Sequence, residues 1–326
     1  MMYKLPNQDN WSGRTDHVKK KSSFRIHQVV NMLDINNVSL EKKAHTNCAL
    51  IGFQCEEGVR RNKGRIGAAK APDSIRGELA KLPWHGLDES SLSDVGNIIC
   101  EGDQLELAQQ EVGKCITTLL KNKKTPIILG GGHETFYGHY LGVRQFIGPD
   151  ASLGIINIDA HFDLRPYDDQ PSSGTMFRQI LDQDRACGYL VLGIQRYGNT
   201  KELFDTADRY SCQYILEEQL TNGLTTETVS VIEQFINEHD YVMLTLCTDV
   251  MSAAHAPGVS APSAFGLIPS VVRSLIRHVI SNNKTLSFDI SEVNPDLDEN
   301  QRTVKLAAGL VNEAIISFQK EENNDH

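Results

Sequence analysis

The sequence has no long apolar run, no paired cysteines and no excess of basic residues, and each absence excludes a class of protein. No segment approaches the roughly 18 consecutive apolar residues that indicate a membrane-spanning helix. Lys19-Lys20-Lys21 is followed by no apolar stretch, so this run does not form a signal peptide. The seven cysteines are scattered without paired spacing, and their odd number argues against a disulfide framework. We therefore expect a soluble cytoplasmic protein with reduced thiols.

Acidic residues outnumber basic residues in this sequence. The chain carries 32 Lys and Arg against 42 Asp and Glu, which gives a formal net charge of −10. Because binding to a nucleic-acid backbone needs a basic surface, we expect no nucleic-acid partner, and we expect no membrane partner either. An anionic substrate would need local arginines that reverse the sign of the field at its pocket.

No linker, repeat or low-complexity tract divides the 326 residues, so we expect a single-domain protein. Residues 1–44 predict an irregular N-terminal segment, partly helical around residues 27–32. Residues 45–320 predict an α/β domain, and residues 321–326 a flexible tail.

Short apolar runs predict strands at Ala49–Phe53, Ile127–Leu129, Gly154–Ile158, Tyr189–Gly193, Tyr241–Leu246 and Lys284–Asp289. Amphipathic stretches between them predict helices at Pro72–Lys81, Leu105–Lys121, Glu134–Phe146, Thr226–Glu238, Pro269–Ile280 and Gln301–Phe318. This alternation predicts βαβ units, and hence a three-layer α/β/α fold around a central, mostly parallel, doubly wound sheet.

Histidines and carboxylates follow two of the predicted strands, in the segments Gly130-Gly131-Gly132-His133-Glu134 and Asp159-Ala160-His161-Phe162-Asp163. In an open parallel sheet, ligands bind at the carboxyl ends of the strands. In extended backbone the alternate residues Asp159, His161 and Asp163 face one side, and His133 approaches from a neighbouring strand end. Imidazole and carboxylate groups so arranged suit a borderline-to-hard divalent metal, so we predict a metal site.

A third segment, Thr245-Leu246-Cys247-Thr248-Asp249-Val250, ends another apolar strand. Asp249 can supply a further carboxylate, with Cys247 two residues earlier on the same side. Two other readings fail. The three glycines before His133 lack the ending of a phosphate-binding loop, and Ser260 and Ser263 have no nucleophile-elbow context.

These segments resemble those of the ureohydrolase superfamily of arginases and agmatinases. In that superfamily a manganese pair is held by a Gly-Gly-x-His, an Asp-x-His-x-Asp and a Ser-x-Asp-x-Asp segment. The resemblance places six residues on the ligand positions in the same order: His133, Asp159, His161, Asp163, Cys247 and Asp249. It implies an arginase-like fold, two divalent metal ions with Mn²⁺ as the expected metal, and a homo-oligomer.

Cys247 departs from this pattern, because the superfamily usually has a metal-bridging aspartate at its position. A thiolate is a soft ligand, whereas Mn²⁺ prefers oxygen donors. Three alternatives follow. The second metal is held more loosely, a softer metal is used, or Cys247 packs as a small buried apolar residue.

Further segments resemble the formimidoylglutamases, the enzymes of histidine degradation within this superfamily. They are Trp11–Asp16, Gly58–Arg65, Asp159–Arg165 and Ala256–Pro262. The segment Asp289-Ile290-Ser291-Glu292-Val293-Asn294-Pro295 resembles the one whose glutamate binds the substrate's cationic group, and that role falls on Glu292. The likeness implies hydrolysis of N-formimidoyl-L-glutamate to L-glutamate and formamide.

In the mechanism that this likeness implies, a hydroxide held between the two metal ions attacks the substrate's amidinium carbon. Glu292 pairs with the amidinium and positions it. Arginases carry a histidine for proton transfer in the loop after Asp-x-His-x-Asp, but residues 164–178 contain none here. We expect Asp163, or a water molecule, to protonate the leaving amino group.

The substrate's glutamate moiety carries two carboxylates, for which arginine is the natural partner because its planar fork binds carboxylate in bidentate geometry. The candidates are Arg61, Arg65, Arg165 and Arg178.

Two alternatives to this function stay open. One is hydrolysis of a guanidino compound such as agmatine or arginine with release of urea. The other is a metal-binding homologue whose catalysis is impaired by Cys247. We predict that His139 packs or faces solvent without a functional role.

Overall fold

The computed structural model describes residues 2–37, 47–86, 91–167 and 170–319. Its strands are β1 (Tyr3–Lys4), β2 (Val30–Met32), β3 (Asn47–Gln54), β4 (Ser91–Ile99), β5 (Thr125–Leu129), β6 (Leu153–Ile158), β7 (Cys187–Ile194), β8 (Gln213–Leu216), β9 (Tyr241–Cys247) and β10 (Thr285–Ser291). Its helices are α1 (Glu57–Arg61), α2 (Ala71–Leu79), α3 (Leu105–Lys121), α4 (Thr135–Ile147), α5 (Met176–Gln183), α6 (Lys201–Arg209), α7 (Glu217–Leu220), α8 (Thr226–Asn237), α9 (Pro269–Ile280) and α10 (Arg302–Phe318). The predicted tail, residues 321–326, lies outside the described residues.

The strands form one ten-stranded sheet in the order β1-β4-β3-β5-β10-β9-β6-β7-β8, with β2 also paired to β4. Only β1 runs antiparallel to its neighbour among the described strand pairs. The predicted α/β fold with a mostly parallel central sheet is therefore confirmed. Strands β5, β10, β9 and β6 lie side by side at its centre, so their carboxyl ends share one edge.

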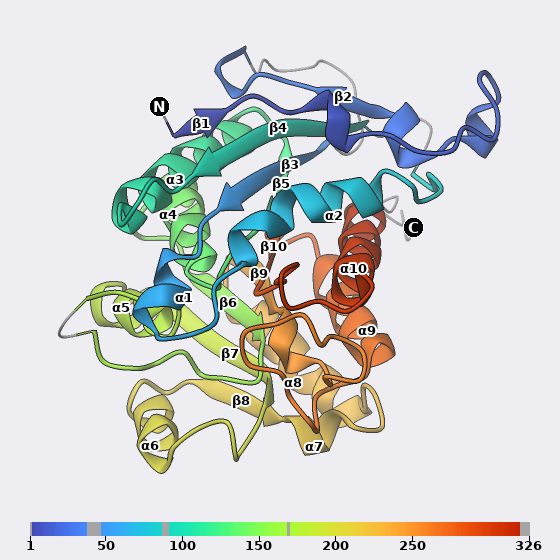
Figure 1. Cartoon of the computed structure of the whole chain (residues 1–326). Coiled ribbons are helices and arrows are strands. Elements are labelled where there is room, and N and C mark those ends of the chain that lie inside the picture. The colour runs from blue at the N-terminus through green and yellow to red at the C-terminus, as the bar shows by residue number, and fades with distance from the viewer. Residues whose placement is uncertain (1, 38–46, 87–90, 168–169, 320–326) are drawn as a thin grey trace, which may run out of the picture.

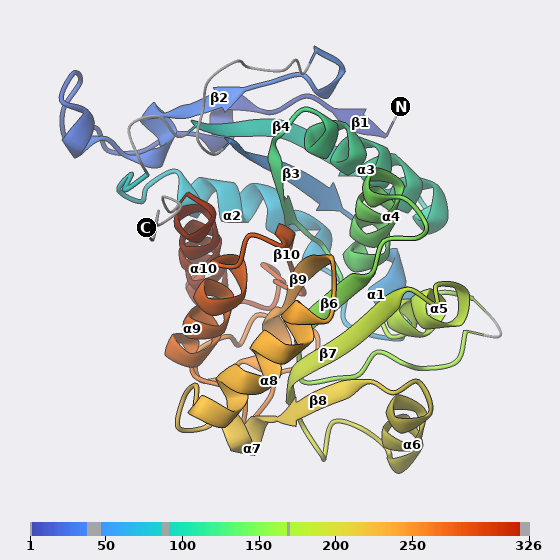
Figure 2. The same ribbon diagram turned by 180° about the vertical axis from the view of Figure 1, so that it is seen from behind.

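Helices cover both faces of the sheet (Figures 1 and 2). Residues of α3, α4 and α5 pack in one apolar core, and residues of α2, α8, α9 and α10 pack in the other. The central strand β6 contributes to both, because Ile155 enters the first core while Ile156 and Ile158 enter the second. This is the alternation that period-two side-chain geometry requires of a strand buried on both faces. Within the described part of the chain, no helix has the length and hydrophobicity needed to cross a bilayer.

Every strand and helix predicted from the sequence has a counterpart. The strands β1, β2, β4 and β8 and the helices α1, α5, α6 and α7 were not predicted. Of these, β4 shows most clearly why. Its sequence carries Asp94 and Asn97 in the middle, and such residues rarely occupy a buried strand. Both find partners on Arg76 of α2, which donates to Asp94 Oδ1 at 2.8 Å and to Asn97 Oδ1 at 2.7 Å. Arg76 is itself only 1% exposed, so Asp94 and Asn97 are paired with a buried guanidinium, whose Nε alone has no hydrogen-bond partner.

The N-terminal segment was expected to be irregular, and its described part consists mainly of loops and short 3₁₀ turns. It also supplies β1 and β2 on the outer edge of β4. Around residues 27–32, where partial helix was expected, one 3₁₀ turn (Ile26–Gln28) precedes strand β2. Trp11 anchors the segment, because its indole N–H donates to Asp94 Oδ2 at 2.8 Å.

Candidate metal centre

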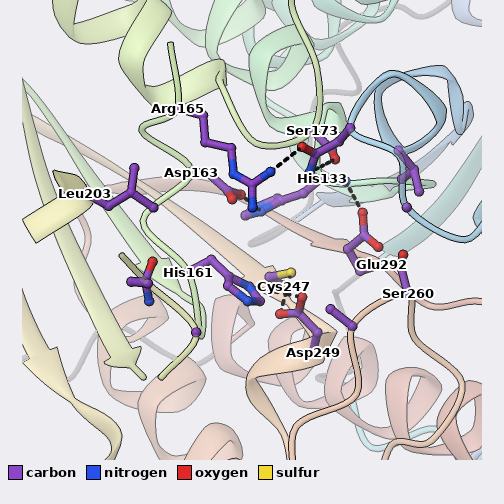
Figure 3. A pocket seen from close by; sticks show the side chains of 16 residues that line it. His133, His161, Asp163, Arg165, Ser173, Leu203, Cys247, Asp249, Ser260 and Glu292 are labelled. Atoms are coloured by element: carbon purple, nitrogen blue, oxygen red, sulfur yellow. Dashed lines mark hydrogen bonds and ion pairs between the residues drawn. The ribbon is translucent and has the colours of Figure 1, made fainter. Parts of the chain in front are cut away.

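Four neighbouring strand ends bring the predicted site residues together. His133 follows β5, Asp159 follows β6, Cys247 ends β9, and Glu292 follows β10. His133, Cys247 and Glu292 line a pocket of about 110 Å³ at the carboxyl edge of the sheet, into which their side chains point (Figure 3). Its other lining residues include His161, Asp163, Arg165 and Asp249.

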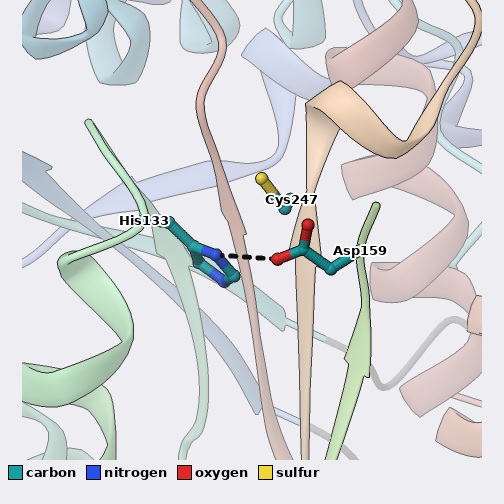
Figure 4. A group of neighbouring side chains, drawn as sticks. All are labelled: His133, Asp159 and Cys247. Atoms are coloured by element: carbon teal, nitrogen blue, oxygen red, sulfur yellow. Dashed lines mark ion pairs between the residues drawn. The ribbon is translucent and has the colours of Figure 1, made fainter. Parts of the chain in front are cut away.

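Two groups of possible metal ligands share one residue. His133, Asp159 and Cys247 form the first group (Figure 4), and Asp159, His161 and Asp249 form the second. Within each group the ligand atoms lie within 4.8 Å of one another. A carboxylate common to two groups could contribute a ligand to each of two neighbouring cations.

Short contacts hold the first group in place. His133 Nδ1 lies 3.1 Å from Asp159 Oδ2 and 2.9 Å from Asp163 Oδ2. Asp163 therefore joins His133 although it lies outside the two groups. Asn157 steadies the shared carboxylate, because its amide donates to Asp159 Oδ2 at 3.1 Å.

His161 contacts both other members of the second group. His161 Nδ1 lies 3.6 Å from Asp159 Oδ1 and 3.3 Å from Asp249 Oδ2. The backbone N–H of His161 also donates to Asp159 Oδ1 at 2.8 Å. The imidazoles of His133 and His161 thus lie on opposite oxygens of one buried carboxylate.

The charges of this cluster favour added positive charge. Burial works to lower the pKa of His133, but Asp159 and Asp163 outweigh it and raise that pKa well above its usual value. His161 behaves likewise, because Asp249 and Asp159 overcome the effect of burial on its pKa. Carboxylates that draw protons onto two buried imidazoles would equally favour divalent cations. The imidazole and carboxylate donors suit such ions.

Cys247 is the buried thiol of the first group. Its thiol donates to Asp249 Oδ1 at 2.9 Å, and burial together with the charges of Asp159 and Asp249 raises its pKa well above the usual value. Without a cation Cys247 is therefore a neutral thiol. Its Sγ nevertheless lies within 4.8 Å of the possible ligand atoms of His133 and Asp159.

The backbone around Asp163 corrects one step of the sequence reasoning. Strand β6 ends at Ile158, and Asp163 has a φ of 50°, so Asp159, His161 and Asp163 do not converge through extended alternation. Glu292 also has a left-handed φ, of 67°. Such backbone strain in residues other than glycine concentrates at functional sites.

Glu292 reaches the pocket from behind His133. Its Oε1 accepts the backbone N–H of His133 at 2.9 Å, and its own N–H donates to the carbonyl of Gly131. Burial, followed by the negative charges of Asp249 and Glu134, raises the pKa of Glu292 to about 8. A cation entering the pocket would therefore favour ionisation of this carboxyl.

Of the four candidate arginines, only Arg165 lines the pocket within the described structure. It is an exposed residue whose Nη1 donates to Asn62 Oδ1 at 3.0 Å. Asn62 and Ser173, which also line the pocket, were not singled out in the sequence because loop asparagines and serines carry no distinctive spacing.

The other three arginines have structural partners. Arg61 pairs with Glu57 at 2.8 Å and with Glu106 at 2.5 Å. Arg65 donates to the backbone carbonyls of Val259 and Ser260, and so braces one wall of the pocket. Arg178 lies 3.4 Å from Asp182 and over the ring of Tyr210.

Comparison with known proteins agrees with this architecture. Residues 46–317 match the Arginase family. The chain is 53% identical to a formimidoylglutamase of Geobacillus sp. (strain WCH70) and 54% identical to one of Geobacillus thermodenitrificans (strain NG80-2), in each case over 98% of both chains.

Solved structures share the fold. The crystal structure of formimidoylglutamase from Bacillus subtilis superposes with a TM-score of 0.80 at 20% identity, covering 94% of this chain and 95% of the other. Trypanosoma cruzi formiminoglutamase with Mn²⁺ gives a TM-score of 0.76 at 22% identity, covering 89% and 99%. This chain belongs to the arginase family.

Proposed function

We propose that this protein hydrolyses N-formimidoyl-L-glutamate to L-glutamate and formamide, as a metal-dependent formimidoylglutamase. The observation that carries the proposal is the pair of ligand groups joined by Asp159 beneath a pocket that Glu292 and Arg165 line. The full-length relatives described above carry this activity in their names.

Two divalent ions, with Mn²⁺ as the first choice, fit the donors of this cluster. One ion would be held by His133, Asp159, Asp163 and Cys247, and the other by Asp159, His161 and Asp249. Bound divalent ions lower the pKa of coordinated water and so supply a nucleophile at neutral pH. In this assignment Cys247 acts as a ligand through its thiolate.

Glu292 holds the planar amidinium of the substrate. Its carboxyl is buried and fixed by the N–H of His133, so it can accept N–H bonds from the substrate without reorganising. Because it is fixed, the electrophilic carbon is held in one position, and such positioning lowers the barrier to attack.

Asp163 carries the proton that the reaction must move. Burial and the charge of Asp159 raise its pKa, which favours a carboxyl that takes a proton from the attacking water and gives it to the leaving nitrogen. The C–N bond to glutamate then breaks, and formamide and a protonated amino group remain.

Arg165 binds a carboxylate of the glutamate moiety. Hydrogen bonds to a charged group are worth about 1.5–3 kcal/mol. Arg165→Ala should therefore raise KM roughly 10- to 100-fold with little change in kcat, whereas Arg165→Lys should recover part of the loss. Arg196→Ala removes an exposed arginine outside the pocket lining and serves as the matched control.

A substrate panel tests the assignment. Metal-loaded protein should release formamide and glutamate from N-formimidoyl-L-glutamate, and it should act far more slowly on agmatine, arginine and guanidinobutyrate. Urea release from agmatine at a comparable rate would refute the proposal. Family likeness also leads us to propose a cytoplasmic homo-oligomer, which sedimentation of the purified protein and fractionation of cells would test.

A further inference from the structure

A continuous buried chain of hydrogen bonds lies behind His133, on the side away from the pocket. His133 Nε2 lies 3.1 Å from Thr245 Oγ1, and the Thr245 hydroxyl donates to Asp289 Oδ1 at 2.8 Å. The other oxygen of Asp289 lies 2.7 Å from His139 Nδ1. The chain ends at Ser287 Oγ, 2.6 Å from His139 Nε2.

These groups are inaccessible to solvent. Thr245, Ser287, Asp289 and His139 have no exposed surface, and His133 is 1% exposed. His139 is thus packed in the interior, one of the two outcomes expected from the sequence, and both of its ring nitrogens have polar partners. A buried polar network of this kind stabilises one arrangement strongly only when every member is satisfied.

Asp289 sets the direction of every bond in the chain. An ionised carboxylate only accepts hydrogen bonds, so both Thr245 and His139 must donate to it. With its hydrogen given to Asp289, the Thr245 hydroxyl accepts from His133. The N–H of Nε2 is then directed to Thr245, and Nδ1 is the ring nitrogen that faces Asp159 and Asp163. A cation bound among these groups would replace the proton on Nδ1 and accept its lone pair.

We propose that His139 is a positioning residue for the metal centre, which holds His133 in the tautomer that can bind a metal ion through Nδ1. This inference rests on the proposed metal function of His133. His139 touches neither the pocket nor the ligand groups, and it acts through Asp289 and Thr245. Without the N–H of His139, Oδ2 of Asp289 is left unsatisfied in a dry interior. The carboxylate whose Oδ1 accepts from Thr245 then loses the contact that fixes its orientation, and the position of the Thr245 hydroxyl behind His133 is less well defined.

A residue that hydrogen-bonds directly to a metal-ligating histidine typically contributes 10- to 100-fold to metal affinity. His139 acts on His133 through two further hydrogen bonds, so we expect it to contribute about tenfold. His139→Leu, which has no donor, should therefore weaken Mn²⁺ binding to the apoprotein by about this factor. His139→Asn places its amide donor near the position of Nδ1 and should keep most of the affinity.

Tyr140→Phe is the matched control on the same helix. It removes a hydroxyl that donates to Asp184 Oδ2 at 2.8 Å, away from the chain behind His133. It should lower thermal stability and leave Mn²⁺ affinity unchanged. If His139→Leu does not fold, His139→Gln replaces it, because its longer side chain carries the amide toward Ser287 rather than Asp289.

Direct titration of apoprotein with Mn²⁺, followed by the electron paramagnetic resonance signal of the free ion, gives affinity and stoichiometry without an activity assay. Equal affinity of wild type, His139→Leu and His139→Asn would overturn the role of His139. Equal affinity of the Asn and Gln variants would overturn it as well. A wild-type protein that binds no Mn²⁺ would refute the metal centre itself, together with this proposal.

Discussion

Glu134, the residue after His133, provides a quantitative test of how burial controls charge near the site. It has no exposed surface and lies between two close glycine backbones, since a Cβ on Gly58 or Gly132 would come within 2.7 Å of its carboxyl. Its Oε1 accepts the N–H of Gly58 at 3.0 Å, whereas its Oε2 has no hydrogen-bond partner. Burial is the main reason that its pKa is raised from 4.5 to about 7.

The sign and size of the effect follow from proton linkage. Because the folded-state pKa of Glu134 lies above the unfolded value, the folded protein binds more protons between pH 4.5 and about 7, and stability falls as pH rises through this window. The destabilisation is about 0.8 kcal/mol at pH 5 and about 3.3 kcal/mol at pH 8. Glu134→Gln removes this term at every pH. The gain in unfolding free energy should therefore be about 2.5 kcal/mol larger at pH 8 than at pH 5.

The assay is denaturant unfolding of the metal-free protein, with EDTA present, at a series of pH values. Comparing two pH values cancels any constant effect of burying the new amide. Glu101→Gln removes the same charge at an exposed position and is the control for net charge. A difference between Glu134→Gln and wild type that stays constant from pH 5 to pH 8, or shrinks with pH, would contradict the reasoning.

Three further predictions concern the site and its support. Residues that hydrogen-bond to metal ligands typically contribute roughly 10- to 100-fold to metal affinity, and Cys247→Ala should weaken Mn²⁺ binding by more than this, whereas Cys247→Asp should still bind two ions per chain. Unchanged stoichiometry and affinity in the alanine variant would mean that Cys247 only packs. Glu292→Gln keeps an acceptor for the N–H of His133 but loses the charge. An ion pair 4 Å apart contributes about 4 kcal/mol near a protein surface, so kcat/KM for formamide release should fall roughly 10³-fold. A loss of less than tenfold would show that Glu292 does not bind the amidinium. Arg76→Met leaves the buried carboxylate of Asp94 without its guanidinium partner, and it should reduce the free energy of unfolding measured in urea by about 3–5 kcal/mol. A loss of less than about 1 kcal/mol would mean that water or another group takes the place of the guanidinium.

The sequence by itself determined the alternation of strands and helices and the strand ends that carry the site. Both depend on local patterns. An apolar run of the right length makes a strand wherever it lies, and parallel strands place their carboxyl ends on one edge. His133, Asp159 and Cys247 could therefore be predicted to meet before any contact between them was known, whereas the resemblance to the ureohydrolase superfamily assigned Glu292 to the same site.

Only the tertiary structure decided which polar residues have partners. Arg165 and Arg61 are equally plausible substrate ligands in the sequence, but acidic groups from α1 and α3 engage Arg61 while Arg165 is left at the pocket. The polar strand β4 and the buried His139 are explained only by groups distant in sequence, on α2 and β10. The physical reason is that hydrogen-bond satisfaction depends on neighbours in space, and no spacing along the chain records them.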